Sequence, residues 1–211
     1  MDRSAQIDTF CRFTRVSRET IISLKKYENL LIEANKNLNL IGKSTVKSIW
    51  TRHFLDSAQV IDFVDKNNKS LLDIGSGAGF PGLVLALIAQ DRKISLKIKL
   101  IDKSPKKIKF LDKAIKELDL NVEAINKNVF EEKSKLEDDV IVFRAFKPLQ
   151  NVLELIHNKA NNWKKILIFL GKTGKFELLQ ASKSWDIKYK QQDSITSSDS
   201  LLIEVTNLEK L

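Results

Sequence analysis

Length, composition and charge narrow the classes of protein that this chain can be. It has 211 residues, 43% of them hydrophobic, which suits a folded domain with a sizeable core and excludes a disordered tail. No apolar run reaches the roughly 18 residues that a membrane span needs, and the N-terminal segment lacks the apolar stretch of a secretory signal. The single cysteine, Cys11, has no partner for a disulfide or a zinc cluster. We therefore expect a cytoplasmic protein with no membrane anchor and no metal.

The basic charge of the chain does not by itself identify a partner. Lysine and arginine number 36 against 27 aspartate and glutamate, a formal net charge of +9 at pH 7. Such an excess is typical of proteins that bind nucleic acid. It is also what a compositionally biased genome produces, since the excess is mostly lysine beside much asparagine and isoleucine. The charge leaves both interpretations open.

The first part of the chain has the hydrophobic spacing of helices. Apolar residues recur at intervals of three and four within residues 4–37, which predicts helix there. After the loop "NLNLIGKST", a second helical stretch is expected over residues 46–64, with Ser44 or Thr45 as its N-cap. The polar segment "DKNNKS" then interrupts the pattern. These features predict a helical extension over residues 1–69 that packs on the rest of the chain.

Beyond this extension, short strand patterns alternate with helical ones. Alternation of this kind predicts an α/β fold, a mostly parallel sheet with helices on both faces, over residues 70–211. Strands are expected over 71–74, 96–102, 121–126, 139–146, 164–171, 185–191 and 201–208. Helices are expected over 81–90, 104–120 and 149–160. The last two strands are expected to form an antiparallel edge of the sheet.

The segment "LLDIGSGAGFPG" places four of the chain's seven glycines directly after the first expected strand. Ligands of open α/β sheets bind outside the carboxyl ends of the strands, and glycines there let a ligand approach the main chain. Gly77, Gly79 and Gly82 match the dinucleotide fingerprint G-x-G-x-x-G, but this match begins two residues late. Counted from Gly75, where the strand ends, the third glycine position is Phe80 and the fingerprint fails.

The better description of this loop is D-x-G-x-G-x-G, which begins at Asp73. It is similar to the signature of class I methyltransferases that use S-adenosylmethionine. Asp102 ends the second strand, 23 residues after Gly79, where a carboxylate can accept hydrogen bonds from both hydroxyls of a ribose. A dinucleotide enzyme would need the same acid, so Asp102 indicates a ribose and leaves the cofactor open. Two other methylation chemistries lack support. Amino-adenine methyltransferases carry a Pro-Pro pair after the fourth strand, where this chain has "FRAFKP". Cytosine-C5 methyltransferases need a nucleophilic cysteine on the sheet, and Cys11 lies in the N-terminal helical part of the chain.

Several segments resemble one family, in the same order along the chain. They are "NLNLIGKS", "TRHFLDS", "LLDIGSGAGFPGLVLAL", "LIDKSPKKIKFLDKAIKELDL", "FRAFKPL" and, more loosely, "LGKTG". Together they resemble the bacterial small-subunit rRNA guanine-N7 methyltransferases, also called glucose-inhibited division protein B, over about residues 20–205. Phe143 stands where serine is usual in that family. The resemblance implies a class I, Rossmann-like fold and transfer of a methyl group from S-adenosylmethionine to N7 of a guanine in 16S rRNA.

The resemblance also implies a set of site residues and a partner. The implied cofactor residues are Asp73, Gly75, Ser76, Gly77, Gly79, Phe80, Asp102, Val129, Phe130 and Arg144. Arg144 and His53 are candidates for positioning the substrate, and Lys147 and Lys172 for binding RNA. Guanine N7 carries a lone pair and no proton, so no general base is expected. The expected partner is small-subunit rRNA or the assembling 30S subunit, and the expected state of the enzyme is a monomer.

Two structural roles and two other functions stay open on the sequence alone. His53 and Asp56 are three residues apart and share a helix face, where they form either a packing hydrogen bond or a wall of the guanine site. Arg144 either contacts the ligands or makes a structural ion pair. The alternative functions are a small-molecule methyltransferase and an RNA-binding assembly factor that keeps a vestigial cofactor fold.

Overall fold

The N-terminal part of the protein is helical. The structure, a computed structural model, describes residues 2–131 and 135–211. It begins with α1 (Arg3–Thr14) and α2 (Arg18–Leu38). A run of short helices follows, comprising η1 (Lys43–Ser48), η2 (Trp50–Leu55), α3 (Asp56–Ala58) and η3 (Ile61–Phe63). Within the described ranges, no helix is both long and apolar enough to cross a membrane.

The single helix predicted over residues 4–37 is in fact two helices. Arg15 adopts a left-handed conformation (φ 54°), and its N–H donates to the carbonyl of Cys11, which closes α1. Ser17 then caps α2, because its side-chain oxygen accepts the N–H of Thr20 at 3.3 Å. A break of three residues hardly disturbs an apolar period that continues on both sides. The pattern therefore predicted one helix where two caps separate two.

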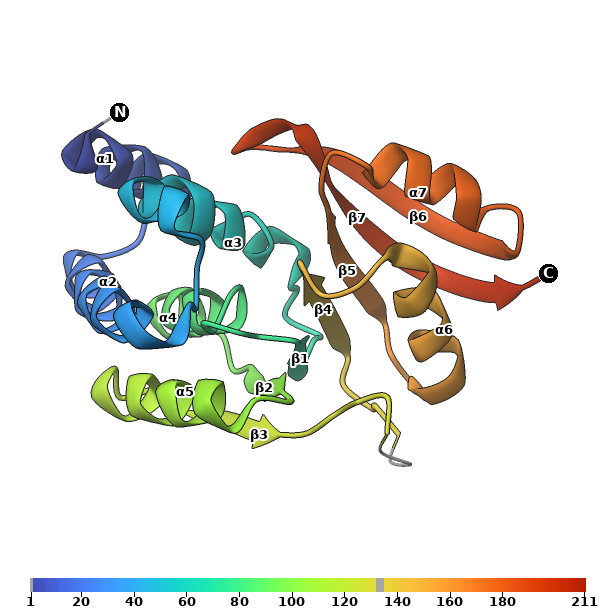
Figure 1. The fold of residues 1–211 in the computed structure, drawn as a ribbon, viewed down its shortest axis with the longest axis horizontal. Coiled ribbons are helices and arrows are strands. Elements are labelled where there is room, and N and C mark those ends of the chain that lie inside the picture. Colours follow the sequence, from blue (N-terminus) through green and yellow to red (C-terminus); the bar gives the residue numbers. More distant parts are fainter. Residues whose placement is uncertain (1, 132–134) are drawn as a thin grey trace.

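The rest of the chain builds one seven-stranded sheet. Its strands are β1 (Ser70–Ile74), β2 (Lys97–Asp102), β3 (Val122–Asn126), β4 (Val140–Arg144), β5 (Lys165–Leu170), β6 (Trp185–Ser194) and β7 (Ser197–Lys210). Their order is β3-β2-β1-β4-β5-β7-β6 (Figure 1). Strands β1 to β5 pair in parallel, whereas β7 is antiparallel to both β5 and β6. The predicted α/β class is confirmed, although the last strand lies inside the sheet and leaves β6 at its edge.

Helices cover both faces of this sheet (Figure 1). On one face, α4 (Gly82–Asp91) and α5 (Pro105–Glu117) pack together with α2 and the run of short helices. On the other face lie α6 (Leu149–Lys159) and α7 (Gly174–Ala181). Neighbouring strand residues point to opposite faces, so Leu71 and Val140 enter the first core while Leu72 and Ile141 enter the second. The N-terminal helices thus share a core with one face of the sheet.

Sequence patterning missed α7. The helix has eight residues, which is barely two turns and too short to display a period. Its apolar residues Phe176 and Leu179 are also exposed, at 63% and 62%, so they do not follow the buried stripe of the helix. Only the packing of Leu178 and Ala181 against the second core shows which face is buried.

Gly82 lets the start of α4 approach the sheet closely. A Cβ atom at this position would lie 2.2 Å from Cδ2 of Leu100 on β2 and 2.8 Å from Oδ2 of Asp73 on β1. The same carboxylate oxygen accepts the N–H of Gly82 at 2.9 Å. The close approach therefore serves a hydrogen bond as well as apolar packing.

We predict that Gly82→Ala lowers the free energy of unfolding by about 1–3 kcal/mol, the usual cost of forcing an extra carbon into a packed core. Urea denaturation followed by circular dichroism measures the change. Gly171→Ala is the matched control, because a Cβ atom at Gly171 meets nothing within 4 Å. An equal loss of stability in both variants would contradict the tight packing inferred at Gly82.

Candidate active site

The loop after β1 turns across the carboxyl end of the sheet. Gly75, Gly77 and Gly79 have φ angles of 77°, 59° and 98°, which residues with side chains rarely adopt. The backbone N–H groups of Gly75 and Ser76 both donate to the carbonyl of Ile101 on β2, at 2.8 and 3.0 Å. The glycines therefore allow a path that these hydrogen bonds hold against the neighbouring strand.

Asp102, at the end of β2, supports the same loop. Its Oδ2 accepts the N–H of Gly77 at 3.0 Å, and its Oδ1 accepts the N–H of Ser104 at 2.9 Å. Lys107 places Nζ 3.5 Å from Oδ2. A carboxylate has about four acceptor sites, so the two backbone bonds and the Lys107 contact leave capacity for a ligand hydroxyl. Asp102 can thus shape the glycine loop and bind a ribose at once.

A pocket of about 440 Å³ opens beside this loop. It is lined by Ile74, Gly75, Ile101, Asp102, Lys103, Lys107, Lys127, Asn128, Val129, Phe130, Ala145, Phe146 and Lys147. The lining joins one acid to apolar residues and lysines. They come from the ends of β1 and β2, from α5 and from the loops after β1, β2, β3 and β4. Its volume falls in the range of small-molecule and cofactor sites, about 300–1,000 Å³.

An aromatic pair forms one wall of the pocket. Phe146 packs on the glycine loop so closely that a Cβ atom at Gly75 would lie 2.3 Å from Cδ2 of its ring. The ring stacks on Phe130, with centroids 5.8 Å apart and planes 9° apart. Phe146 was not among the cofactor residues implied by the resemblance, and its only signal was its place in "FRAFKPL". The glycine at position 75 is therefore needed for side-chain packing as well as for its φ angle.

Asp73 lies beneath the loop and is fully buried. Its Oδ2 accepts the N–H of Gly82, while its Oδ1 has no hydrogen-bond partner within the part of the chain that the structure describes. Burial raises the pKa of Asp73 to about 7, although the hydrogen bond from Gly82 acts to lower it. The side chain holds the start of α4 from below and does not line the pocket.

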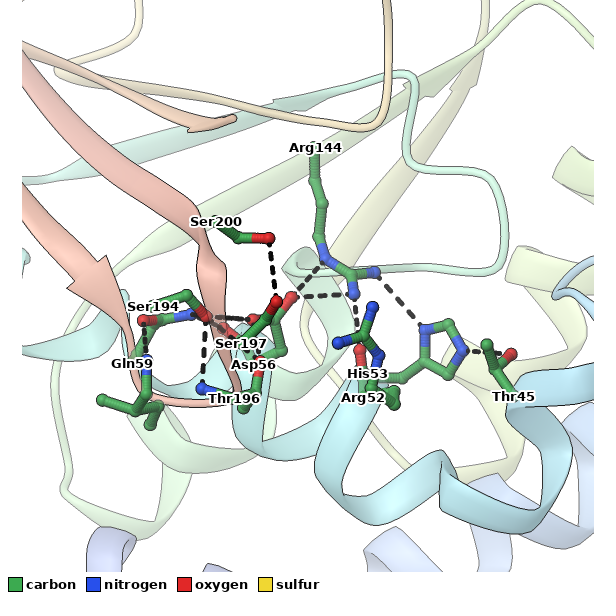
Figure 2. A network of polar contacts seen from close by, with 11 residues as sticks. Thr45, Arg52, His53, Asp56, Gln59, Arg144, Ser194, Thr196, Ser197 and Ser200 are labelled. Atoms are coloured by element: carbon green, nitrogen blue, oxygen red, sulfur yellow. Dashed lines mark hydrogen bonds and ion pairs between the residues drawn. The ribbon is translucent and has the colours of Figure 1, made fainter. Parts of the chain in front are cut away.

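Arg144, the last residue of β4, belongs to a polar network that joins the sheet to the N-terminal helices (Figure 2). Its Nε and Nη2 atoms donate to Oδ2 of Asp56 at 3.0 and 2.9 Å. Nη2 also donates to the carbonyl of Arg52 at 2.7 Å, and Nη1 lies 3.5 Å from Nδ1 of His53. The ion pair that the sequence left open is therefore present, and it joins β4 to the helices η2 and α3.

His53 is held in one orientation at the end of this network. Its Nε2 lies 2.8 Å from Oγ1 of Thr45, whose own hydroxyl donates to the carbonyl of Gly42. Oγ1 is then an acceptor, so the network assigns the ring proton to Nε2. Burial, together with the positive charge of Arg144, lowers the pKa of His53 to about 3. The prediction that Ser44 or Thr45 caps this helical run is wrong, because the run already begins after Gly42 and includes both residues.

Phe80 links the network to the glycine loop. Its ring stacks on His53, with centroids 5.0 Å apart, and the guanidinium of Arg144 lies 5.7 Å from its centroid. Its other neighbours are the rings of Tyr27 and Phe54 in the N-terminal helices. With 5% of its surface exposed, Phe80 is a buried junction of three segments.

The predicted site residues therefore fall into separate groups. Gly75, Asp102, Val129 and Phe130 line the pocket with Lys147. The network and the buried underside of the loop hold Asp73, Ser76, Gly79, Phe80, His53 and Arg144, and Gly77 lies half-buried in the loop itself. Lys172 lies on the loop after β5, exposed, with Nζ 3.7 Å from Oδ2 of Asp199.

The residues of the pocket fit S-adenosylmethionine. Asp102 offers acceptors for ribose hydroxyls, and the apolar surfaces of Val129 and Phe130 suit an adenine ring. The main chain at Gly77 is open to a ligand, since a Cβ atom there would meet only the carbonyl oxygen of Gly75, at 3.7 Å. Across residues 2–131 and 135–211, no group of three His, Cys, Asp or Glu side chains could hold a metal ion.

Solved structures share the fold of this chain. A TehB-like S-adenosylmethionine-dependent methyltransferase from Corynebacterium glutamicum aligns with a TM-score of 0.52 and 18% identity, covering 72% of this chain and 87% of that one. The 16S rRNA methylase RmtB aligns with a TM-score of 0.53 and 14% identity, covering 91% and 76%. At these identities the likeness shows the fold alone, which is that of class I S-adenosylmethionine-dependent methyltransferases.

Sequence comparison shows the family. The model of the family described as rRNA small subunit methyltransferase G matches residues 20–203. Ribosomal RNA small subunit methyltransferase G of Pelagibacter ubique is 39% identical over 197 residues, 92% of each chain. That of Rickettsia akari is 35% identical over 196 residues, 93% of this chain and 98% of the relative. The chain belongs to this family, which confirms the predicted enzyme class and its cofactor, S-adenosylmethionine.

We predict that Asp102→Ala weakens binding of S-adenosylmethionine by about 1.5–3 kcal/mol, the usual worth of hydrogen bonds to a charged group. The loss has two sources, the ribose contacts and the support of the N–H of Gly77. Isothermal titration calorimetry on the folded variant measures it. Asp112→Ala, an exposed acid on α5, is the control and should bind like the wild type. Unchanged affinity in Asp102→Ala would remove Asp102 from the site.

Proposed function

We propose that this enzyme transfers a methyl group from S-adenosylmethionine to N7 of a guanine in 16S rRNA. The observation that carries the proposal is the family match over residues 20–203, together with a pocket whose acid, glycine loop and aromatic wall suit the cofactor. The enzyme acts in the cytoplasm as a monomer, on rRNA or on the assembling 30S subunit. Residues 70–211 form its methyltransferase domain, and residues 1–69 form a helical extension packed on one face.

The proposed chemistry needs orientation and no proton transfer. S-adenosylmethionine supplies an electrophilic methyl group on a positively charged sulfur. Guanine N7 attacks that carbon with its lone pair as the carbon–sulfur bond breaks, so positive charge moves from sulfur to the purine. Asp102 and the walls of the pocket hold one partner while the neighbouring loops hold the other. Orientation of this kind can lower the barrier by roughly 7–11 kcal/mol.

The electrostatics of the network support this chemistry. A positive guanidinium beside a purine that gains positive charge would oppose methyl transfer. The carboxylate of Asp56 neutralises Arg144 across 2.9 Å, which reduces that opposition. Both side chains are mostly buried, at 14% and 16% exposure, so water screens the pair only weakly. Arg144 can then donate hydrogen bonds to a ligand without adding net charge.

Lysines around the pocket suit an RNA substrate. Lys103, Lys107, Lys127 and Lys147 all line it, and Lys103 and Lys147 are exposed. Lysines at such a rim bind phosphates and make affinity fall with salt. N7 lies on the major-groove edge of guanine, which A-form RNA encloses in a deep, narrow groove. The target guanine is therefore in an exposed or opened segment of the rRNA.

The test is transfer of a radiolabelled methyl group from S-adenosylmethionine to isolated 16S rRNA and to 30S subunits, followed by nucleoside analysis. The expected product is 7-methylguanosine at one position. Asp102→Ala is the control, assayed at a concentration of S-adenosylmethionine below the dissociation constant of this variant. It should transfer less label if methylation occurs at the proposed site. Label on another base, or label only on small molecules of a cell extract, would contradict the proposal.

We further predict a rate of methyl transfer that does not depend on the titration of a histidine. Because the pKa of folded His53 is about 3, the ring stays neutral from pH 6 to pH 8, with its proton on Nε2. Single-turnover rates with bound RNA should be flat over that range, and His53→Asn should lower them without changing the profile. Measurements stay at pH 6 or above, since protonation at lower pH favours the unfolded chain, whose histidine pKa is about 6.5.

A different pH profile would reverse the assignment of His53. A rate that falls with decreasing pH near 6.5 in the wild type, and does not fall in His53→Asn, would show that His53 accepts a proton during the reaction.

A further inference from the structure

The carboxylate of Asp56 lies where three distant segments meet (Figure 2). Its Oδ2 accepts both N–H groups that Arg144 directs from the end of β4. Its Oδ1 accepts hydrogen bonds from Thr196, in the turn between β6 and β7, at 2.6 Å and from Ser194, the last residue of β6, at 3.1 Å. Gln59 adds a third bond to Oδ1 at 2.9 Å. The helical extension, β4 and the β6–β7 turn are thus tied to a single side chain.

These bonds leave Asp56 no capacity for a substrate. Two donors reach one oxygen and three reach the other, whereas a carboxylate has about four acceptor sites. Contact between Asp56 and the guanine would require one of these bonds to break. Any effect of Asp56 on the reaction must therefore pass through the groups that it holds.

Arg144 is the positively charged group that Asp56 binds, through two hydrogen bonds. A guanidinium has five N–H donors. Those on Nε and Nη2 go to Asp56 and to the carbonyl of Arg52, and Nη1 directs one toward His53. The second N–H of Nη1 has no hydrogen-bond partner among the described residues, so a ligand can accept a hydrogen bond from it. Ala145 and Phe146, which follow Arg144 directly, line the pocket, so the backbone of Arg144 lies beside the proposed site. Its guanidinium lies 5.7 Å from the centroid of Phe80, the aromatic residue that closes the glycine loop.

We propose that Asp56 is a positioning residue for methyl transfer, which fixes the Arg144 guanidinium in the orientation that the reaction uses. This inference rests on the proposed function. Stability alone is a poor reason for such an arrangement, because apolar residues of similar volume usually replace a buried ion pair without loss. A carboxylate that accepts hydrogen bonds from three segments is instead fixed in position, and it therefore holds the arginine side chain in one orientation. The turn at Ser194 and Thr196 contributes to this orientation by restraining the carboxylate itself.

The first test compares Asp56→Asn, Arg144→Lys and the double variant with Asp62→Asn as the control. Asp62 is an exposed acid of η3 whose only role in the described structure is an ion pair with Arg92. We expect Asp56→Asn to lower kcat for methyl transfer by about tenfold or more, and the double variant to lose little beyond the worse single variant. Rates are taken per folded molecule, well below the melting temperature. Additive losses, or a kcat equal to that of Asp62→Asn, would overturn the inference.

A rescue experiment separates positioning from a merely structural role. Arg144→Ala removes the guanidinium but leaves its acceptors, Asp56 and the carbonyl of Arg52. Added guanidinium ion, far below denaturing concentrations, should bind there and restore part of the rate. The same ion should restore nothing in Arg144→Ala combined with Asp56→Asn. Equal rescue in both backgrounds would mean that Asp56 does not hold the guanidinium.

A measurement that does not depend on enzyme activity tests this inference separately from the proposed function. In a ¹⁵N-labelled protein, the Nε–H signal of Arg144 is assigned by its loss in Arg144→Lys. We expect this signal to be protected from solvent exchange in the wild type and in Asp62→Asn, and to exchange quickly in Asp56→Asn. A wild type that methylates no rRNA would contradict the proposed function alone. An Nε–H signal unaffected by Asp56→Asn would overturn the inference even in an active enzyme.

Discussion

The site depends on the hydrogen bonds that hold the glycine loop to the end of β2. Two loop N–H groups share the carbonyl of Ile101, and a third donates to the carboxylate of Asp102. These bonds exist only because β1 and β2 are parallel neighbours, which brings their carboxyl ends to one edge. Once the loop is held there, α4 must start beside the sheet, and Gly82 allows that approach. The pocket is what remains between this loop and the loops after β3 and β4.

The two cores of the protein have different relations to this site. The first core continues from the sheet into the N-terminal helices, and Phe80 carries it into the glycine loop itself. The second core, around α6 and α7, supports the loop after β4 from the opposite face, where Phe146 packs against it. A disturbance in either core therefore reaches the pocket through an aromatic ring. Such rings transmit displacement because packed interiors have little spare volume.

Charge is arranged in this protein so that a positive reaction centre is tolerated. The chain is strongly basic, yet Arg144, which directly precedes the pocket residue Ala145, is neutralised by Asp56, and His53 beside it is kept uncharged by burial. Lys103 and Lys147 line the pocket and are exposed, so solvent and salt screen their charges. Such a site suits catalysis by orientation of the two substrates, because this mode of catalysis needs a fixed geometry and no acid or base that titrates.

The sequence by itself determined the local features of this protein. The alternation of strand and helix patterns predicted the α/β fold, and "DIGSGAG" with Asp102 predicted a ribose-containing cofactor, because both depend on residues close in the chain or at strand ends. The two caps between α1 and α2, and the short helix α7, escaped prediction since a few residues carry too little periodicity.

Only the tertiary structure decided what depends on distant segments. It paired Arg144 with Asp56, brought the turn at Ser194 and Thr196 to the same carboxylate, and set Phe146 against Gly75. The members of the Asp56 network come from positions about 90 and 140 residues apart in the chain. No local sequence pattern predicts these contacts, because the packing of the whole sheet and its helices determines which distant residues come within hydrogen-bond distance.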